Sequence, residues 1–116
     1  MYEYKNLLVN TAEDGITTVT INRPKALNAL DTLTLEEMKD CFNRLASDVA
    51  TKSVLITGAG PKSFVAGADL GAMSKMTVTE ARCFSVLGHA VFNAIERIPV
   101  AVVAAINGFA WRRLRT

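Results

Sequence analysis

The stretch VLITGAGPKSFVAGADLGAM (54–73) contains the residues that decide the fold. It opens with a short apolar run closed by glycines, which is typical of a buried strand. It then places Ala66, Gly67 and Ala68 in a row. One carboxylate, Asp69, follows them. Side chains as small as these do no acid–base chemistry, but they let a ligand approach the backbone.

This run of small residues has two interpretations. If the chain turns here from a loop into a helix, successive N–H groups point outward with no partner inside the helix. Such donors suit an oxygen that becomes negatively charged during a reaction, so the turn would hold an oxyanion. The alternative is a tight strand-to-helix turn that needs small residues only for packing. Spacing alone leaves both open.

The residues before this stretch predict a β-hairpin, a loop and a helix. YKNLLVNTAEDGITTVTIN (4–22) has strand-forming residues on both sides of Asp14-Gly15, a dipeptide suited to a turn with positive φ. The loop NRPKALNALD (22–31) follows, and its proline ends the strand. TLTLEEMKDCFNRLA (32–46) has apolar residues at steps of three and four, the mark of an amphipathic helix.

Two pairs of residues have the spacing of a helix capping box. Thr34 and Glu37 have it near the start of the first helix, although Asp31 competes with Thr34 as the cap. Thr77 and Glu80 have it at the start of a second, longer helix.

A proline ends the second helix, and VAVVAAING (100–108) then predicts another buried strand. The order of elements is therefore β-β-α-β-α-β. Apolar strands between helices indicate an α/β (α+β) fold in which helices cover a sheet. This pattern names no reaction.

Length and composition indicate one small globular domain. The chain has 116 residues, half of them hydrophobic and 21% charged, which excludes a disordered protein. The formal net charge is +2, but three of the positive charges are Arg112, Arg113 and Arg115, so residues 1–111 carry one net negative charge. Without a basic stripe elsewhere, we expect no nucleic-acid partner.

The sequence also indicates the cellular compartment. It shows no secretory signal and no apolar run of membrane-spanning length. Cys41 and Cys83 lie in helical patterns without metal-ligand spacing, so we expect buried free thiols in a reducing compartment. These features predict a cytoplasmic protein with no membrane partner and no bound metal.

Other candidate sites are weaker. His89, the single histidine, lies mid-helix with no nucleophile motif, which favours a structural or surface role. GAG (58–60) lacks the third glycine of a dinucleotide fingerprint, and GPKS (60–63) lacks the spacing of a phosphate-binding loop. Glu36 and Glu37 lie on a predicted surface helix, so we expect them to be solvated rather than catalytic.

Three stretches, in this order along the chain, resemble the N-terminal half of the crotonase superfamily, the enoyl-CoA hydratases and isomerases. They are VTINRPKALNALD (19–31), VLITGAGPKSFVAGADLGAM (54–73) and IERIPVAVVAAINGFA (95–110). The resemblance covers residues 1–110, which we therefore take as the N-terminal part of a crotonase-like domain. Isomerases, hydrolases and dehalogenases share this half, so it identifies the superfamily better than the reaction.

The resemblance implies a spiral of ββα turns that binds an acyl-CoA thioester. It implies that the backbone N–H of Ala66 is one donor of an oxyanion hole. Two groups of residues would flank the adenine and pantetheine end of the CoA: Lys25, Ala26 and Leu27, and Ala68, Asp69 and Leu70. No cofactor would be permanently bound, because coenzyme A enters as part of the substrate. Members of the family commonly form trimers and hexamers.

The chain departs from the family after Ala110. The family continues into a motif of the form Leu-Gly-Gly-Gly-Cys-Glu-Leu, which supplies the second oxyanion donor and one of two glutamates that handle the water. Here the sequence is WRRLRT (111–116) instead. The resemblance therefore predicts an enoyl-CoA hydratase of fatty acid metabolism whose 116-residue form is inactive and, with apolar faces uncovered, prone to aggregate. Two alternatives stay open: an isomerase or other acyl-CoA enzyme, and a non-catalytic fragment that binds CoA weakly or only associates with other subunits.

The codons that can encode residues 111–116 offer an explanation of the tail. Trp-Arg-Arg-Leu-Arg-Thr can be written TGG CGG CGG CTG CGA ACT, and one base later the same letters encode Gly-Gly-Gly-Cys-Glu. We therefore expect residues 111–116 to be an out-of-frame tail, produced by a mutation or a sequencing error. Reading the DNA beyond codon 110 checks this, and the hypothesis fails if no frame there encodes Gly-Gly-Gly-Cys-Glu.

Overall fold

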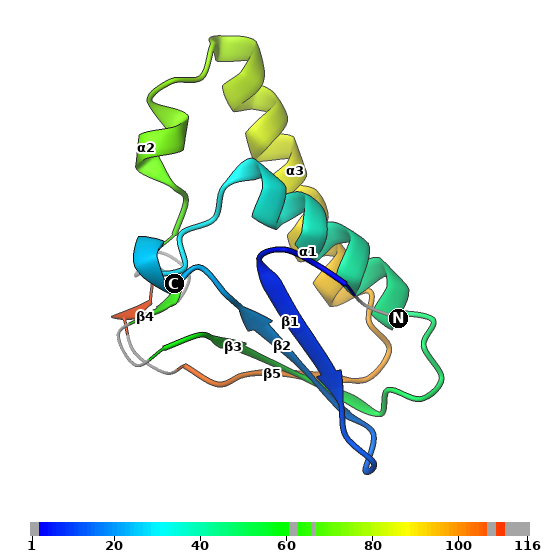
Figure 1. Cartoon of the computed structure of the whole chain (residues 1–116). Coiled ribbons are helices and arrows are strands. Elements are labelled where there is room, and N and C mark those ends of the chain that lie inside the picture. The colour runs from blue at the N-terminus through cyan, green and yellow to red at the C-terminus, as the bar shows by residue number, and fades with distance from the viewer. Residues whose placement is uncertain (1–2, 61–62, 66, 107–108, 111–116) are drawn as a thin grey trace.

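The computed structural model describes residues 3–60, 63–65, 67–106 and 109–110. Its elements, in chain order, are β1 (Leu7–Thr11), β2 (Ile16–Ile21), the 3₁₀ turn η1 (Pro24–Ala26), α1 (Thr32–Leu45), β3 (Ser53–Gly58), β4 (Ser63–Val65), α2 (Leu70–Met73), α3 (Val78–Glu96), β5 (Ala101–Ala104) and β6 (Phe109–Ala110). These elements confirm the predicted mixture of strands and helices (Figure 1).

Four strands form the main sheet in the order β1-β2-β3-β5. β1 and β2 are an antiparallel hairpin, whereas β2, β3 and β5 run parallel, with Val19 opposite Ile56 and Ile56 opposite Ala104. Parallel neighbours need a crossover connection, and here α1 joins β2 to β3 while α3 leads into β5. Both helices therefore lie side by side over the same face of the sheet (Figure 1).

The core fills the space between these helices and the sheet. Side chains alternate along β2 and β3, so one face of each strand is buried and the other is partly exposed. Its buried apolar residues include Leu7, Val19, Ile21, Val54 and Ile56 from the sheet, Leu35, Met38, Phe42 and Leu45 from α1, and Phe84, Val91 and Ala94 from α3. The helix periodicity seen in the sequence thus marks the faces that contact the sheet.

The start of α1 decides between the two predicted caps. Asp31 is the N-cap, and its side chain accepts a hydrogen bond from the N–H of Thr34 at 3.0 Å. The capping box of Thr34 and Glu37 is therefore wrong. The Glu37 carboxylate instead accepts from the backbone N–H groups of Lys5 and Asn6, both at 2.7 Å. Glu37 is thus not simply solvated, because it ties the segment before β1 to α1.

The second capping box is confirmed at the start of α3. The Thr77 hydroxyl accepts from the N–H of Glu80 at 3.1 Å, and the Glu80 carboxylate accepts from the N–H of Thr77 at 2.9 Å. Two backbone donors at the start of this 19-residue helix are thereby satisfied.

Two predictions of burial are wrong. β5 forms within residues 100–108, but it lies at the edge of the main sheet, where β3 is its one paired neighbour among the described strands, and Val103 is 55% exposed. Cys83 is exposed, whereas Cys41 is buried as expected, and both are free thiols. Cys83 precedes the buried Phe84, and adjacent residues of a helix face different directions.

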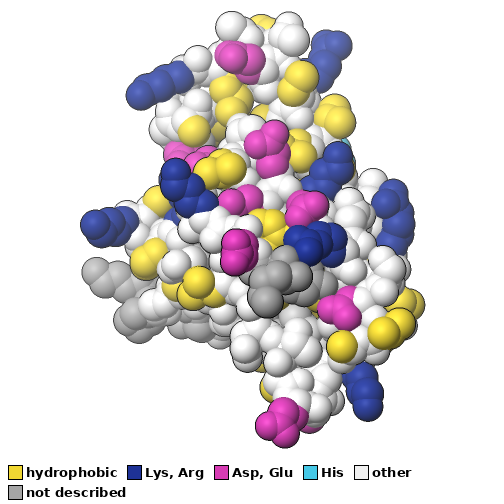
Figure 2. All heavy atoms as spheres, turned by 45° about the vertical axis from the view of Figure 1, so that its right-hand side comes forward, with side chains coloured by type: hydrophobic (Ala, Val, Ile, Leu, Met, Phe, Trp, Pro, Cys, Tyr) yellow, Lys and Arg dark blue, Asp and Glu magenta, His cyan; other side chains and the backbone are white. Residues whose placement is uncertain are grey.

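The surface gives two further observations. Within the described ranges, none of the helices combines the length and the apolar character needed to cross a membrane. On the face shown in Figure 2, Lys and Arg side chains are interspersed with Asp and Glu rather than gathered in one basic stripe.

The hairpin turn needs the glycine that the sequence places there. Gly15 has a φ of +90°, and its carbonyl accepts a hydrogen bond from the N–H of Lys52 at 2.8 Å. A Cβ atom added to Gly15 would lie 2.8 Å from Cγ of Lys52. The predicted positive-φ turn is thus confirmed, and it also anchors the segment that leads into β3.

We expect Gly15→Ala to lower the free energy of unfolding by about 1–3 kcal/mol, because alanine is strained at this φ. Urea denaturation followed by circular dichroism measures the change. The same substitution in a Lys52→Gly background is the control, since there the contacts with Cβ, Cγ and Cδ of Lys52 are gone and the strain remains. If Gly15→Ala has no effect in that background, the conformational argument is wrong.

Candidate functional site

The stretch singled out in the sequence forms a strand-to-helix turn. β4 ends at Val65, and α2 begins at Leu70. Between them Gly67 is buried and has a φ of +100°, a conformation that favours glycine. Asp69 is the N-cap of α2, and its side chain accepts from the N–H of Ala72 at 3.1 Å. The predicted change from loop to helix at this point is confirmed.

This turn runs beside the loop that follows β2. The N–H of Leu30 donates to the carbonyl of Gly67 at 2.8 Å, and the N–H of Asp69 donates to the carbonyl of Leu30 at 2.9 Å. Leu30 and Ala68 therefore form a parallel bridge between segments far apart in the sequence. The amide of Asp69 is occupied by this bridge and is not available to a ligand.

Arg23 links the same two segments through its side chain. Its Nη1 donates to the carbonyl of Ala29 at 2.6 Å and to Oδ2 of Asp69 at 3.2 Å. Its Nη2 lies 3.5 Å from Oδ2 of Asp31, the residue that caps α1. The guanidinium is a planar fork with several fixed donors, so one side chain can hold all three acceptors in one arrangement. It thereby joins the caps of α1 and α2 to the loop between β2 and α1.

The loop between β2 and α1 is rigidly built. Leu27 and Asn28 both have left-handed φ values, 53° and 57°. The Asn28 side chain is fully buried, and its Oδ1 accepts from the N–H of Arg23 at 2.8 Å. Its Nδ2 donates to the carbonyl of Ala59, the residue after β3, at 3.1 Å. Asn28 tolerates this conformation because its short polar side chain bonds to nearby backbone.

The structure brings the two predicted groups of CoA-lining residues onto neighbouring segments. In the first group, Lys25 and Ala26 lie in η1 and Leu27 follows it; Lys25 and Leu27 are exposed. In the second, Ala68 and Asp69 are half-buried, and Leu70 is 76% exposed. The oxyanion donor predicted at Ala66 lies outside the described residues, as does the tail 111–116.

A second pairing brings the end of the described chain to the same place. β4 pairs in parallel with β6, with Ser63 opposite Phe109 and Val65 opposite Ala110. The stretch before the turn and the last predicted family motif are therefore neighbours. Ala110, the last described residue, therefore lies opposite Val65, the last residue of β4.

The Asp69 carboxylate is committed to structure. The N–H of Ala72, and to a lesser degree the Arg23 guanidinium, stabilise its charged form and lower its pKa below the usual 3.8, against an opposing effect of burial. With both oxygens hydrogen-bonded within the chain, Asp69 is ionised at neutral pH and is a poor proton carrier.

An apolar groove opens next to this turn, with a volume of about 230 Å³. Leu30, Leu35, Ala68 and Met73 line one side of it. The other side is a stripe of α3, made of Ala81, Phe84, Ser85, Gly88, His89 and Phe92. We call this hollow the α3 groove. Because Ala68 lies on its rim, a ligand held by the turn can extend an apolar part into the groove.

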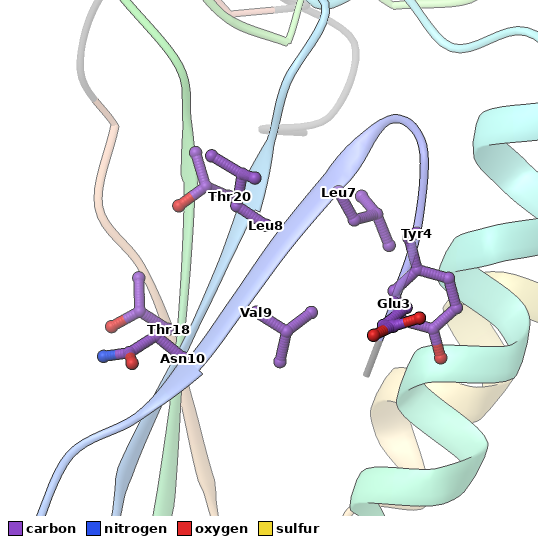
Figure 3. A pocket seen from close by; sticks show the side chains of 8 residues that line it. All are labelled: Glu3, Tyr4, Leu7, Leu8, Val9, Asn10, Thr18 and Thr20. Carbon is purple, nitrogen blue, oxygen red and sulfur yellow. The ribbon is translucent and has the colours of Figure 1, made fainter. Parts of the chain in front are cut away.

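A second hollow, of about 510 Å³, lies along β1 and β2 (Figure 3). In this view Leu7 and Val9 point toward α1, while Leu8, Thr18 and Thr20 lie on the other side of the strands. The Tyr4 hydroxyl already donates to Asp40 at 2.6 Å. Its pKa is raised, mainly by desolvation and to a lesser degree by this hydrogen bond. The Tyr4 hydroxyl is thus already paired, and the hollow lies along β1 and β2 rather than at the turn after β4, so we do not take it as the candidate site.

The remaining candidates have ordinary roles. Burial raises the pKa of the Cys41 thiol to about 12, so Cys41 is not a nucleophile at neutral pH. His89 is exposed and lines the α3 groove, which places it closer to the candidate site than the sequence indicated. Among the described residues no three His, Cys, Asp or Glu side chains converge on a possible metal position.

Sequence reasoning missed Arg23 and the α3 groove. In the sequence Arg23 is only part of a loop motif. Asp31 follows it in the same loop, but its other partner, Asp69, is 46 residues away, so no local signal indicates the bridge. Gly88 is one of the residues that line the groove, and a glycine in the middle of a long helical pattern is the signal that could have pointed to it.

Comparison with known proteins identifies the relatives of this chain. The family model for enoyl-CoA hydratase/isomerase matches residues 11–111. The short-chain-enoyl-CoA hydratase of Clostridium acetobutylicum is 47% identical over 105 residues, which cover 90% of this chain and 40% of that protein. The crotonyl-CoA hydratase of Syntrophomonas wolfei is 46% identical over 107 residues, covering 92% of this chain and 41% of that protein.

A solved structure shares the fold. The crystal structure of an enoyl-CoA hydratase from Bacillus anthracis matches with a TM-score of 0.88 and 32% identity, covering 91% of this chain and 41% of that one. The chain therefore spans about two fifths of the length of these relatives.

The pKa of Asp69 predicts how this site responds to acid. Its folded pKa lies below the usual value, so its ionised form stabilises the fold above pH 3.8, and this contribution is lost as the pH falls through the lowered folded value. We expect Asp69→Asn, which keeps a capping side chain, to be less stable than the parent chain at pH 7 and equally stable near pH 2.

Urea midpoints measured across this range test the expectation. Arg23→Lys is the matched variant, because it keeps the charge and loses the fork, and we expect it to reduce the stability gap between Asp and Asn at position 69. A gap that persists at pH 2 would show that the effect of Asp69→Asn is not electrostatic.

Proposed function

The chain belongs to the enoyl-CoA hydratase/isomerase family, and on that premise we propose that its protein adds water across the 2,3 double bond of a short enoyl-CoA thioester. The observation that carries the proposal is the turn after β4, built of small residues and held beside the loop after β2 by the Leu30–Ala68 bridge. This arrangement leaves room for a thioester next to the backbone, and it opens into an apolar groove.

The chemistry needs stabilisation of one oxygen. When the water oxygen adds to C3, negative charge builds on the thioester carbonyl oxygen, and a proton is then added to C2. We propose that the N–H of Ala66 donates to that oxygen as the charge develops. Fixed backbone donors are effective here because they need no reorganisation when the charge appears. A second donor would come from the chain after Ala110, a proposal supported by the position of Ala110 opposite Val65, the last residue of β4.

The substrate's two ends would occupy different parts of the site. We propose that the CoA portion lies along Lys25, Ala26 and Leu27 and along Ala68, Asp69 and Leu70, where the exposed Lys25 can pair with phosphate. The acyl portion would enter the α3 groove. Coenzyme A arrives as part of the substrate, so no permanent cofactor is required. The relatives' names, short-chain-enoyl-CoA and crotonyl-CoA hydratase, favour a short acyl chain.

An isomerase is the second candidate, because the family description includes both reactions. The two differ in where the proton and the hydroxyl go: hydration gives a 3-hydroxyacyl thioester, and isomerisation only moves the double bond. After Ala110 the sequence WRRLRT supplies neither glutamate that the resemblance implies for the water. We therefore propose that the 116-residue chain binds acyl-CoA thioesters without turning them over.

The setting of the reaction follows from the same premise. We propose a cytoplasmic location, where the free thiols Cys41 and Cys83 stay reduced. We also propose assembly into trimers or hexamers, as the resemblance implies.

The role of the Ala66 amide is testable by removing its N–H group. Ala66→Pro removes the N–H, whereas Ala66→Gly keeps it. We expect Ala66→Pro to weaken binding of acetoacetyl-CoA, whose enolate oxygen carries negative charge, by about 10–100-fold, the effect of losing one hydrogen bond to a charged group. Free CoA should bind both variants equally. Isothermal calorimetry measures the affinities, and urea midpoints report whether each variant folds.

Incubation of the 116-residue chain with crotonyl-CoA completes the test. We expect no 3-hydroxybutyryl-CoA and no shifted double bond by mass spectrometry and NMR. Turnover would contradict the proposal that this chain only binds, and equal affinity of Ala66→Pro and Ala66→Gly for acetoacetyl-CoA would contradict the role of the Ala66 amide.

A further inference from the structure

Gly88 stands at an unusual position for a glycine. It lies in the interior of α3, where glycine lowers helix stability relative to alanine. Its φ is not among the positive values found at Gly15, Gly60 and Gly67, so the backbone does not require it. A Cβ atom added to Gly88 would meet no other atom within 4 Å, so crowding does not require it either.

The space beside Gly88 belongs to the α3 groove. Ala81, Ser85, Gly88 and Phe92 recur at steps of four, three and four, so they form one stripe along the helix. Ala68 lies across the groove from this stripe, at the turn where the thioester is proposed to sit. A side chain at position 88 would project into the room that a substrate entering from Ala68 needs.

The size of the groove indicates which part of a ligand it holds. Its volume of about 230 Å³ is below the roughly 300–1,000 Å³ typical of sites that enclose a whole small ligand. Its walls are apolar residues of the loop before α1, of the turn after β4 and of the helices α1, α2 and α3. The exceptions are Ser85 and His89, which are both exposed. A short hydrocarbon chain fits such a volume and such walls, whereas a nucleotide does not.

We propose that Gly88 is the position that sets the acyl-chain length of the substrate. The absence of a side chain there leaves room for the distal carbons of the acyl group, and any larger residue shortens the chain that the groove accepts. This inference rests on the function proposed above, since it assumes a thioester at the turn. It adds the specificity-determining position that limits the substrate.

The first test concerns the empty space itself. Gly88→Ala should raise the urea midpoint of the chain, because it removes a helix glycine and the new methyl group meets no atom. A lower midpoint would show that the position is crowded and would overturn the inference, whatever the chain binds.

The second test compares acyl chains. Acetyl-, butyryl- and hexanoyl-CoA are titrated by calorimetry into the parent chain, Gly88→Ala and Gly88→Leu. In the parent chain we expect affinity to rise roughly fourfold for each methylene buried. In Gly88→Leu the hexanoyl-to-acetyl affinity ratio should fall at least tenfold, with acetyl-CoA affinity nearly unchanged. Gly88→Ala should lie between. Val86→Leu is the control, because Val86 is 63% exposed and lies outside the groove lining.

The outcomes separate this inference from the proposed function. If all three thioesters bind and Gly88→Leu leaves the ratio unchanged, the role of Gly88 is wrong and the proposed function stands. If Val86→Leu changes the ratio as much as Gly88→Leu does, the effect is not local and the inference is again wrong. If the parent chain binds no CoA thioester, both proposals are contradicted.

Discussion

The candidate site depends on the geometry around the Arg23 guanidinium. This one group faces the carbonyl of Ala29 and the carboxylates of Asp31 and Asp69, and 46 residues separate Arg23 from Asp69 in the sequence. Both carboxylates also cap helices, so the arginine fixes where α1 and α2 begin relative to each other. Without it, the loop after β2 and the turn after β4 are joined mainly by the two backbone hydrogen bonds of the Leu30–Ala68 bridge. The position of the proposed oxyanion turn beside the proposed CoA-binding loop is therefore set by side chains that do not touch the reacting atoms.

The sheet explains why these segments meet. β2 and β3 are parallel, so the loops that leave their carboxyl ends emerge at the same edge, the position where parallel α/β sheets bind ligands. The loop after β2 carries Arg23 and Asn28, and the chain after β3 leads into β4 and the turn. Asn28 closes the gap between them by bonding to the carbonyl of Ala59. β1 only extends the sheet at its other edge, beside β2. The topology thus delivers the segments, and the polar contacts then hold them in register.

Local pattern was enough for most of the fold but not for its contacts. The positions of β1, β2, β3, β5, α1 and α3, the turn at Gly15 and the capping box at Thr77 follow from residue type and spacing, because neighbours in sequence decide them. The short strands β4 and β6, which pair with each other, were not predicted. The cap of α1 does not: Thr34 and Glu37 have the right spacing, yet Glu37 bonds to amides before β1, a contact that only the folded chain creates. The exposure of β5 follows from its place at the sheet edge, which its apolar sequence does not reveal. In the site, the small residues pointed to the turn, whereas Arg23 and the α3 groove depend on segments that meet only in three dimensions.

The turn after β4 offers no group suited to proton transfer. Asp69, the one carboxylate in the turn, has its pKa lowered by the N–H of Ala72 and by Arg23, and a base held so firmly ionised is a weak acceptor of protons. The neighbouring residues are too small to carry a proton at all. The turn can offer fixed backbone donors. The α3 groove can offer space for an apolar group, and small residues line both of its sides: Ala68 on one, Ala81 and Gly88 on the other. Hydration of an enoyl thioester also needs a base for the water and an acid for C2. The residues of the turn supply neither group. The pairing of β4 with β6 brings Ala110 opposite Val65, so both strands end at the start of the turn.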